Sequence, residues 1–560
     1  MKKQIDFQLL AILVGGILFN FLFWMEEHGI NLLLYSIFLL VILLVDKEIP
    51  KSKNMLIVSA CHLFAGLLVV FNQSELTIIA WYISLAIFIG IVHAQQLRSI
   101  FAAFLVAIMQ MVTAPFNLFK KIINTRFGKL SIKPLLKPIK YIIIPFFVLL
   151  VFSGLYSAAS PVFAKYLGQG VTAILDLLEK VFYFFFSDVS FARLMHTIFG
   201  ILLTAGIIIS FANKDVEKAE LTLQEKLIRK RKNNKRVSFM SELSQLFLGN
   251  LLKRKMALKT EYIIGIISFL ALNLLLLALN IIDFTTLWIG NVSSFDDTYL
   301  STQLHEGANS LIFSIMMAML VILYFFSGNL NFFSKNKTLK ILAYAWIIQN
   351  TFLVFSVLIR DYHYINLSGL TYKRIGVLVF LTLCLIGLFT VYIKVAQQKT
   401  LFFLVKVNGQ IWYILLLVFG MVNWDVFIVN YNINNRDKIA LDLDHLMKMS
   451  DKTLPIIVKN RTMLSNYVSK SNYANIVETE VVIDTVSATA PSANDSIAVV
   501  KPLPVDKAQE TIEKKKKALD YFNDDIDNRV ERFKERWESP TWLSWNYRDW
   551  QTYLYFTNKK

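Results

Sequence analysis

The sequence predicts an all-α protein: a polytopic helical membrane bundle of about 11 spans, followed by a helical segment outside the membrane. Three observations lead to this fold class. The 560 residues are 56% hydrophobic and only 18% charged, with a mean hydropathy of +0.52, whereas soluble domains carry about 25% charged residues. The apolar residues form blocks long enough to cross about 30 Å of hydrocarbon as helices. These blocks also lack the alternation that strands require.

Eleven apolar blocks are predicted to span the membrane within a transmembrane domain over residues 1–429. The predicted spans are residues 7–24, 29–45, 55–71, 76–93, 141–163, 190–212, 262–282, 308–326, 339–359, 375–395 and 409–429. The first block follows Lys2 and Lys3, as the apolar part of a signal peptide would. Its length and the lack of a small-x-small cleavage pattern indicate an uncleaved span instead.

Basic residues set the predicted orientation. If the N-terminus lies inside, 32 lysines and arginines fall in inner segments and five in outer segments before the tail. This asymmetry predicts a cytoplasmic N-terminus and, after an odd number of spans, an extracytoplasmic C-terminus. The net charge of +18 is therefore interpreted as a topology signal, and we expect no nucleic-acid partner.

Two further apolar stretches are predicted to lie at the interface. Residues 99–118 are placed at the inner interface or as a re-entrant segment, because a crossing would put the seven basic residues of 120–140 outside. Pro115 is expected to break that helix near its end. Residues 172–186 are amphipathic and predict an outer interfacial helix.

Two predicted inner loops, residues 119–140 and 213–260, are rich in lysine and arginine. Such clusters either serve only as topology determinants or also bind anionic lipid head groups.

The character of the chain changes after residue 429. Residues 430–470 predict a short helical segment in which Asp451 and Thr453 are possible helix caps. Residues 471–505 are rich in small and polar residues and predict a flexible linker. Residues 506–560 predict a charged helix followed by an aromatic C-terminal tail.

Motifs for catalysis or cofactor binding are missing from the sequence. No two of the seven histidines have a helical spacing of three or four residues, and no phosphate-binding loop or nucleophile motif occurs. We therefore expect no metal, no cofactor and no catalytic residue, and the chain is not expected to be an enzyme.

Charged residues gather at the predicted outer ends of the spans. They are Arg193, Asp283, His305, Glu306, Arg360, Asp361, Arg374 and Asp425. Charge near the hydrocarbon tends to be paired or functional, so one interpretation is a polar outer cleft that receives a ligand or the tail. Its ion pairs would join Arg360 or Arg374 to Asp283 or Asp425. The alternative is that these are ordinary interface residues with snorkelling side chains.

Two other groups of residues have two interpretations each. Gln349 and Asn350 lie near the middle of a span, where they form hydrogen bonds between helices or line a pore or substrate site. The tail residues Trp542, Trp545, Trp550 and Tyr553 either dock on the membrane interface or a partner, or pack within this protein.

Several short stretches carry a family resemblance. They are Gln303 to Gly307, Trp346 to Asn350, Arg360 to Tyr364 with Gly369 to Thr371 and Arg374, Asn423 to Asp425 with Tyr431 to Ile433, Leu441 to Asp444, and Trp545 and Asn546 with Tyr553. These pieces resemble an uncharacterised bacterial membrane family, the domain of unknown function 4173 and its relatives. The resemblance implies a membrane architecture in a bacterial inner membrane, and it implies no activity.

Three hypotheses for function follow. The first is a non-enzymatic inner-membrane scaffold or accessory subunit that contacts a protein partner on its extracytoplasmic side. The second is a transporter or channel for a small molecule or lipid. The third is a membrane-embedded enzyme that acts on lipid or glycan, which would require paired acids or histidines near one leaflet.

Overall fold

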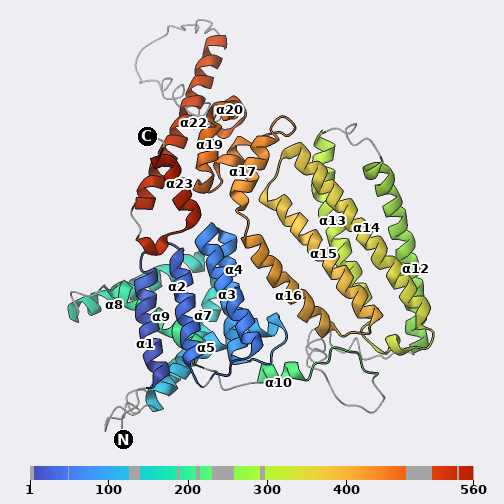
Figure 1. Cartoon of the computed structure of the whole chain (residues 1–560), viewed down its shortest axis with the longest axis horizontal. Coiled ribbons are helices and arrows are strands. Elements are labelled where there is room, and N and C mark those ends of the chain that lie inside the picture. Colours follow the sequence, from blue (N-terminus) through green and yellow to red (C-terminus); the bar gives the residue numbers. More distant parts are fainter. Residues whose placement is uncertain are drawn as a thin grey trace, which may run out of the picture. The chain divides into compact units, whose positions relative to one another are not determined.

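The computed structural model describes residues 6–47, 49–124, 139–185, 190–209, 215–229, 258–289, 297–473, 507–538 and 541–558. Figure 1 shows that these residues are almost entirely helical. Their β-structure is limited to an isolated bridge between Lys226 and Lys399. The prediction of an all-α membrane bundle is confirmed, in keeping with the need to satisfy backbone hydrogen bonds within each span.

Eight of the described helices are long and apolar enough to cross a membrane. They are α3 (Lys53–Asn72), α4 (Glu75–His93), α5 (Ile100–Asn124), α9 (Phe191–Ile208), α12 (Leu258–Asp283), α14 (Asn336–Ser368), α15 (Tyr372–Ala396) and α16 (Leu401–Gly420). Four others are apolar over a shorter length: α1 (Phe7–Phe23), α2 (Ile30–Val45), α7 (Ile139–Ala159) and α13 (Asp297–Phe325). Seven of the eleven predicted spans overlap helices of the first group and the other four overlap the shorter apolar helices, whereas α5 was not predicted to span.

The last predicted span has the wrong bounds. The apolar run over residues 409–429 is not one helix: α16 ends at Gly420 and α17 (Trp424–Asn434) begins after Asn423. The side chain of Asn423 accepts a hydrogen bond from the backbone N–H of Val426 at 3.3 Å. This N-cap starts a new helix inside an apolar run, which hydropathy alone does not detect.

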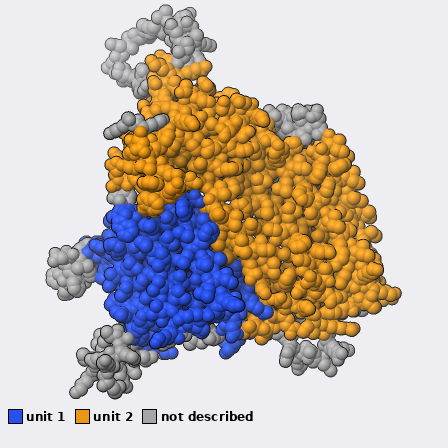
Figure 2. All heavy atoms as spheres, in the orientation of Figure 1, with its two compact units in different colours: residues 1–218, 541–544 blue, residues 219–540, 545–560 orange. Residues whose placement is uncertain are grey.

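The chain forms two compact units, which are coloured separately in Figure 2. Unit 1 comprises residues 1–218 together with Thr541–Ser544, and unit 2 comprises residues 219–540 together with 545–560.

In unit 1, α1 and α9 pack closely along their length. A Cβ added at Gly16 would lie 2.2 Å from the Ile201 side chain, and one at Gly200 would lie 2.6 Å from the Phe19 ring. Small residues at such positions let helix backbones approach in a membrane, where packing drives association. The hydroxyl groups of Tyr35 on α2 and Thr204 on α9 are 2.9 Å apart in the same interior.

Helix α5 of unit 1 lies across the ends of other helices. Gly90, near the end of α4, lies against the backbone of Ala103, and the amide of Gln110 donates to the carbonyl of Ile209, which caps the end of α9. Further along α5, Lys121 forms an ion pair with Asp6, which caps the start of α1. Both halves of α5 therefore contact the same end of the surrounding helices, although its length and composition would also allow a span.

The expectation that Pro115 breaks α5 is wrong. The helix continues for nine residues beyond it to Asn124. Leu118 is buried against α1 and α9, and this packing sustains the helix past the missing N–H of the proline.

Helices α7 and α8 (Pro161–Phe185) of unit 1 pack on each other. The interfacial helix predicted over residues 172–186 corresponds to α8, which starts eleven residues earlier, at Pro161. Pro161 occupies its first turn, a position that proline favours. The short helix α10 (Asp215–Leu221) follows α9, and the carboxylate of Glu217 accepts from the backbone N–H of Gln96 at 3.0 Å.

In unit 2, helices α12 to α16 run side by side (Figure 1). Phe269, Ile322, Leu353 and Leu388 are among the buried residues that form their common core. Two short helical turns complete this part, η2 (Phe284–Trp288) after α12 and η4 (Asn329–Phe332) after α13. At 33 residues, α14 is about 50 Å long, which exceeds about 30 Å of hydrocarbon. It is therefore longer than a single untilted crossing needs.

The rest of unit 2 forms a helical domain that we call the cap. It consists of α17, α18 (Leu443–Met447), η5 (Asp451–Thr453), α19 (Leu454–Lys459), α20 (Arg461–Leu464), η6 (Ser465–Lys470), α22 (Lys507–Glu538) and α23 (Tyr547–Thr557). The sequence indicated a charged helix over residues 506–537, and α22 matches it. The predicted linker falls mostly outside the described residues.

The core of the cap is shared with the membrane helices. Ile365 at the end of α14, Leu370 in the following loop and Ile375 at the start of α15 pack in one cluster with Phe522 and Ile526 of α22. Phe522 and Ile526 are completely buried. The cap is thus built onto the ends of α14 and α15 rather than tethered to them.

Arginines hold α22 against the shorter helices of the cap. Arg529 donates to Asp451 at 2.8 and 3.0 Å and to the carbonyl oxygens of Met447 and Met449 at 2.6 Å. Arg461 binds both carboxylate oxygens of Asp527 at 2.7 and 2.8 Å.

Of the two expected helix caps, Thr453 occupies the N-cap position of α19, but its side chain makes no capping hydrogen bond and its hydroxyl donates to the Ser450 carbonyl at 2.8 Å. The expectation for Asp451 is wrong, because Asp451 is the first residue of η5 and an ion-pair partner of Arg529. Side chains that do form N-cap hydrogen bonds in this domain include Asp442 at the start of α18, which accepts from the N–H of His445 at 2.9 Å.

Candidate functional site

A row of polar side chains follows the contact between α12 and α14, which we call the seam. Asn273 and Asn280 are seven residues apart on α12, so both point to one face of the helix. Their side-chain amides donate to the carbonyl oxygens of Leu342 at 3.1 Å and Gln349 at 3.2 Å on α14. The Gln349 amide in turn donates to the Asn273 side-chain oxygen at 3.0 Å. The seam is therefore a ladder of amide hydrogen bonds between two parallel helices.

An ion pair closes one end of the seam. Asp283, at the end of α12, accepts from the Arg360 guanidinium on α14. Asp283 is 2% exposed. Next to this pair, the Trp288 indole donates to the Ser356 hydroxyl at 3.3 Å and stacks on Phe352. This is one of the ion pairs that the sequence suggested.

Asn350 does not take part in the seam. Its side chain is buried and its amide donates to the Trp346 carbonyl of its own helix at 2.8 Å. Gln349, its neighbour, forms the interhelical contacts instead. Of the two polar residues singled out in this span, one therefore joins helices and the other is held by its own backbone.

Arg374 organises the loop between α14 and α15. Its guanidinium donates to the carbonyl oxygens of Ser368 and Gly369 and stacks over the Tyr364 ring at 4.0 Å. Gly369 has a φ of 78°, which glycine adopts without a steric penalty. A Cβ there would lie 2.8 Å from the side-chain oxygen of Asn432. Arg374 thus donates its hydrogen bonds to backbone carbonyl groups of this loop.

Asp361 is buried one residue after Arg360, and one of its carboxylate oxygens has no hydrogen-bond partner among the described residues. Asp425, in the first turn of α17, accepts a hydrogen bond from the Tyr372 hydroxyl at 2.5 Å. Among the described cleft residues of unit 2, Asp283 and Arg360 lie at the end of the seam, whereas Arg374 and Asp425 lie where the α14–α15 loop meets the start of the cap.

One further expected cleft residue lies in unit 1, and the side chains of two others are not described. Arg193 belongs to unit 1, where its guanidinium donates to the Asn20 side chain at 3.1 Å. His305 and Glu306 lie on the first half of α13, and their side chains are outside the described residues.

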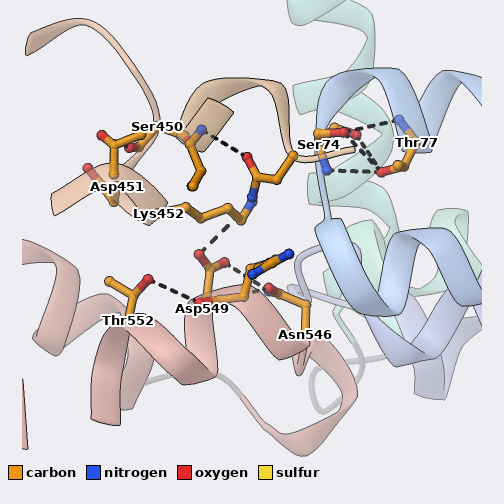
Figure 3. Close-up of polar contacts among 12 residues, drawn as sticks. Ser74, Thr77, Ser450, Asp451, Lys452, Asn546, Asp549 and Thr552 are labelled. Carbon is orange, nitrogen blue, oxygen red and sulfur yellow. Dashed lines mark hydrogen bonds and ion pairs between the residues drawn. The ribbon is translucent and has the colours of Figure 1, made fainter. Parts of the chain in front are cut away.

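A charged cluster sits inside the cap. Figure 3 shows Lys452 directed at Asp549, with 4.0 Å between the ammonium and the carboxylate, and Asn546 donating to the same carboxylate at 2.8 Å. Burial lowers the pKa of the Lys452 ammonium, while Asp549 and Asp425 act in the opposite direction. Burial also lowers the pKa of His445, which faces Asp442, Arg374, Lys448 and Asp425. The cluster joins α17, α18, η5 and α23 electrostatically.

The aromatic tail residues of unit 2 pack mainly within the cap. Trp545 and Trp550 have ring centroids 6.1 Å apart, and Tyr553 lies 6.2 Å from the Trp537 ring. The Tyr553 hydroxyl donates to Glu538 at 3.1 Å. Trp550 keeps 38% of its surface exposed.

The segment Thr541–Ser544, which contains η7 (Trp542–Ser544), clusters with unit 1. The Glu26 carboxylate, between α1 and α2, accepts from the hydroxyl groups of Thr541 at 2.8 Å and Ser544 at 2.5 Å. The Glu27 N–H donates to Ser544 at 2.9 Å. Leu543 is buried, whereas Trp542 is 62% exposed. We call this segment the strap.

The candidate residues were only partly visible in the sequence. Asn273 and Asn280 were missed, although their seven-residue spacing inside an apolar block was a signal. Lys452, Asp549 and Glu26 were missed because their partners are distant in the chain, and no local pattern marks them. No group of three or more metal-ligating side chains occurs within the described ranges.

Comparison with protein families found one match. The model described as Domain of unknown function (DUF4153) covers residues 57–460. The match supports an uncharacterised family, but a different one from the domain of unknown function 4173 that the short motifs resembled. Curated proteins and solved structures gave no match.

Proposed function

The chain belongs to the family of Domain of unknown function (DUF4153), whose description names no activity, and we propose that it is a non-enzymatic membrane scaffold or accessory subunit. Its cap would be the surface that contacts a protein partner. The observation that carries this proposal is the shared core: residues at the ends of α14 and α15 pack with α22 of the cap. A surface fixed in this way loses little conformational freedom when a partner binds, which favours affinity.

Two exposed tryptophans are the residues most suited to a partner. Trp550 on α23 of the cap and Trp542 on the strap of unit 1 are exposed, whereas Trp545 and Tyr553 are half-buried. Tryptophan is enriched among interface residues that carry binding energy. Each would contribute large apolar area at low entropic cost.

The experiment is purification of the full chain from its native membrane in a mild detergent, with the stoichiometry of bound protein measured by mass spectrometry. We expect a stoichiometric partner, and Trp542→Ser and Trp550→Ser should each reduce its recovery at least about tenfold. Tyr521→Ser is the matched control, because Tyr521 is an exposed aromatic residue elsewhere on the cap. A lone monomer, or equal recovery with all three variants, would refute the proposal.

The proposed location is a bacterial inner membrane, with a cytoplasmic N-terminus and the cap on the extracytoplasmic side. The distribution of basic residues supports it. In this orientation the basic loops would face the inner leaflet, where anionic lipid head groups attract lysine and arginine. An epitope inserted at residue 490 should be accessible to antibody from outside intact spheroplasts. Accessibility only after lysis would contradict the orientation.

A transporter or channel remains the second candidate, and the seam is the observation in its favour. A pore lined by Asn350 is not supported, because the Asn350 side chain is buried and hydrogen-bonded to its own helix. A lipid- or glycan-directed enzyme is the third candidate. Asp425 with its neighbour His445 would be its acid and base, and Asp425→Asn without a phenotype would weaken it.

A further inference from the structure

The seam between α12 and α14 carries acceptor oxygens that the described residues leave without a partner. The orientation of its amides is fixed by their neighbours. The amide nitrogens of Asn273, Asn280 and Gln349 all face oxygen atoms, so a flipped amide would place oxygen against oxygen. This fixes which side-chain atom of each amide is the oxygen, and that oxygen can only accept hydrogen bonds.

Two of these oxygens are buried and unpaired within the described part of the chain. They are Oδ1 of Asn280 and Oε1 of Gln349, and the second carboxylate oxygen of Asp283 shares this property. Asn280 is 7% exposed. Asn280 and Asp283 are three residues apart, so they are neighbours on one face of α12. In hydrocarbon, a polar atom without a hydrogen bond costs several kcal/mol.

The chemistry of these atoms selects the ligand. All three are oxygen acceptors, and amide and carboxylate oxygens bind species that bring hydrogen-bond donors. The Nε of Arg360 at the end of the seam is a buried donor that also lacks a partner within the described residues. The ion pair of Arg360 with Asp283 balances the carboxylate charge in part, so the site does not require a second full counter-charge. A small species with several donors would match the acceptor atoms of two helices in contact.

We propose that the seam is a polar site inside the membrane domain that admits a small hydrogen-bond-donating species, either water or a primary ammonium group. Asn280 and Gln349 provide its acceptors from the two helices, and Asp283 and Arg360 stand at its end. This proposal does not depend on the cap or on a protein partner.

The test is the reactivity of single cysteines in a background that lacks Cys61 and Cys384, in the full chain in lipid nanodiscs. Asn280→Cys and Gln349→Cys probe the two sides of the seam. The matched controls are Ile281→Cys and Ile348→Cys, because each is adjacent in sequence, lies at the same depth and is exposed outside the seam, at 55% and 68%. The probes are 2-hydroxyethyl and 2-aminoethyl methanethiosulfonate, one neutral and one carrying an ammonium group.

We expect both seam cysteines to react at least about tenfold faster than their controls, because thiols react as hydrated thiolates. A difference seen with both reagents would assign the site to ammonium-bearing species as well as water. A difference with the neutral reagent alone would assign it to water. Equal rates at seam and control positions, whether slow or fast, would overturn the proposal. If Asn280→Cys fails to fold, Gln349→Cys on the other helix still decides the question.

Discussion

Asn432 on α17 and Leu370 in the α14–α15 loop are joined by two reciprocal hydrogen bonds, the pattern that paired residues on adjacent β-strands form. The Leu370 N–H donates to the Asn432 side-chain oxygen at 2.6 Å, and the Asn432 amide donates to the Leu370 carbonyl at 2.9 Å. One side chain of the cap thus satisfies both backbone groups of a buried loop residue. Because buried backbone groups need partners, this pair ties the cap to the membrane helices.

Asn432→Ala should destabilise unit 2 by about 2–4 kcal/mol, because it leaves two buried backbone groups unpaired. The apparent melting temperature in detergent is the measurement. Asn430→Ala is the matched control, since Asn430 is exposed on the same helix. Similar small shifts for both variants would mean that the Asn432 contacts do not stabilise the cap.

Asp283→Ala should cost about 3–5 kcal/mol, because it leaves the Arg360 guanidinium charged and unpaired at the end of the seam. The double variant Asp283→Leu with Arg360→Met should recover most of that stability, since it removes both charges. Thermal unfolding of the purified protein would measure both effects. A double variant as unstable as Asp283→Ala would show that the pair is not the relevant interaction.

The cap should lose stability on mild acidification through His445. Burial holds the pKa of His445 below its ordinary value of 6.5. Between the lowered pKa and 6.5 the unfolded chain binds more protons than the folded chain, so unfolding becomes more favourable as the pH falls through that window. Melting temperatures between pH 7.5 and pH 5 are the measurement. His445→Asn should make the decline shallower, and an unchanged decline would assign it to other groups.

Glu26→Ala should release the strap, because the Glu26 carboxylate accepts from both Thr541 and Ser544. We expect chymotrypsin, which cleaves after aromatic residues and leucine such as Trp542 and Leu543, to cut several-fold faster between α22 and α23 than in the wild type, since backbone freed from its contacts is the preferred site of cleavage. Glu75→Ala is the control, because Glu75 is an exposed acidic residue at the start of α4. Equal cleavage rates would show that these hydrogen bonds do not hold the strap.

The sequence predicted the apolar helices because hydropathy acts locally. Seven of the eleven predicted spans overlap helices long and apolar enough to cross a membrane, and the other four overlap shorter apolar helices. The boundary at Asn423 was missed because one N-cap interrupts an apolar run without changing its average hydropathy. Pro115 was misjudged because tertiary packing at Leu118 outweighs the missing N–H.

The candidate site was harder to predict because it depends on contacts between distant residues. The pairing of Arg360 with Asp283 could be suggested from depth in the membrane, but Arg374 turned out to bind carbonyl oxygens. Asp451 looked like a cap because its partner Arg529 lies 78 residues away. The strap could not be foreseen, since Glu26 and Ser544 are separated by 518 residues.

The most direct test of the account is hydrogen–deuterium exchange of the full chain in lipid nanodiscs. If the cap shares its core with α14 and α15, the amides of residues 518–526 on α22 should exchange as slowly as those of α17. Asn432→Ala should accelerate exchange in both segments together. Rapid exchange of residues 518–526 while α17 stays protected would contradict the account, because α22 would then be a separate helix rather than part of a cap fixed to the membrane domain.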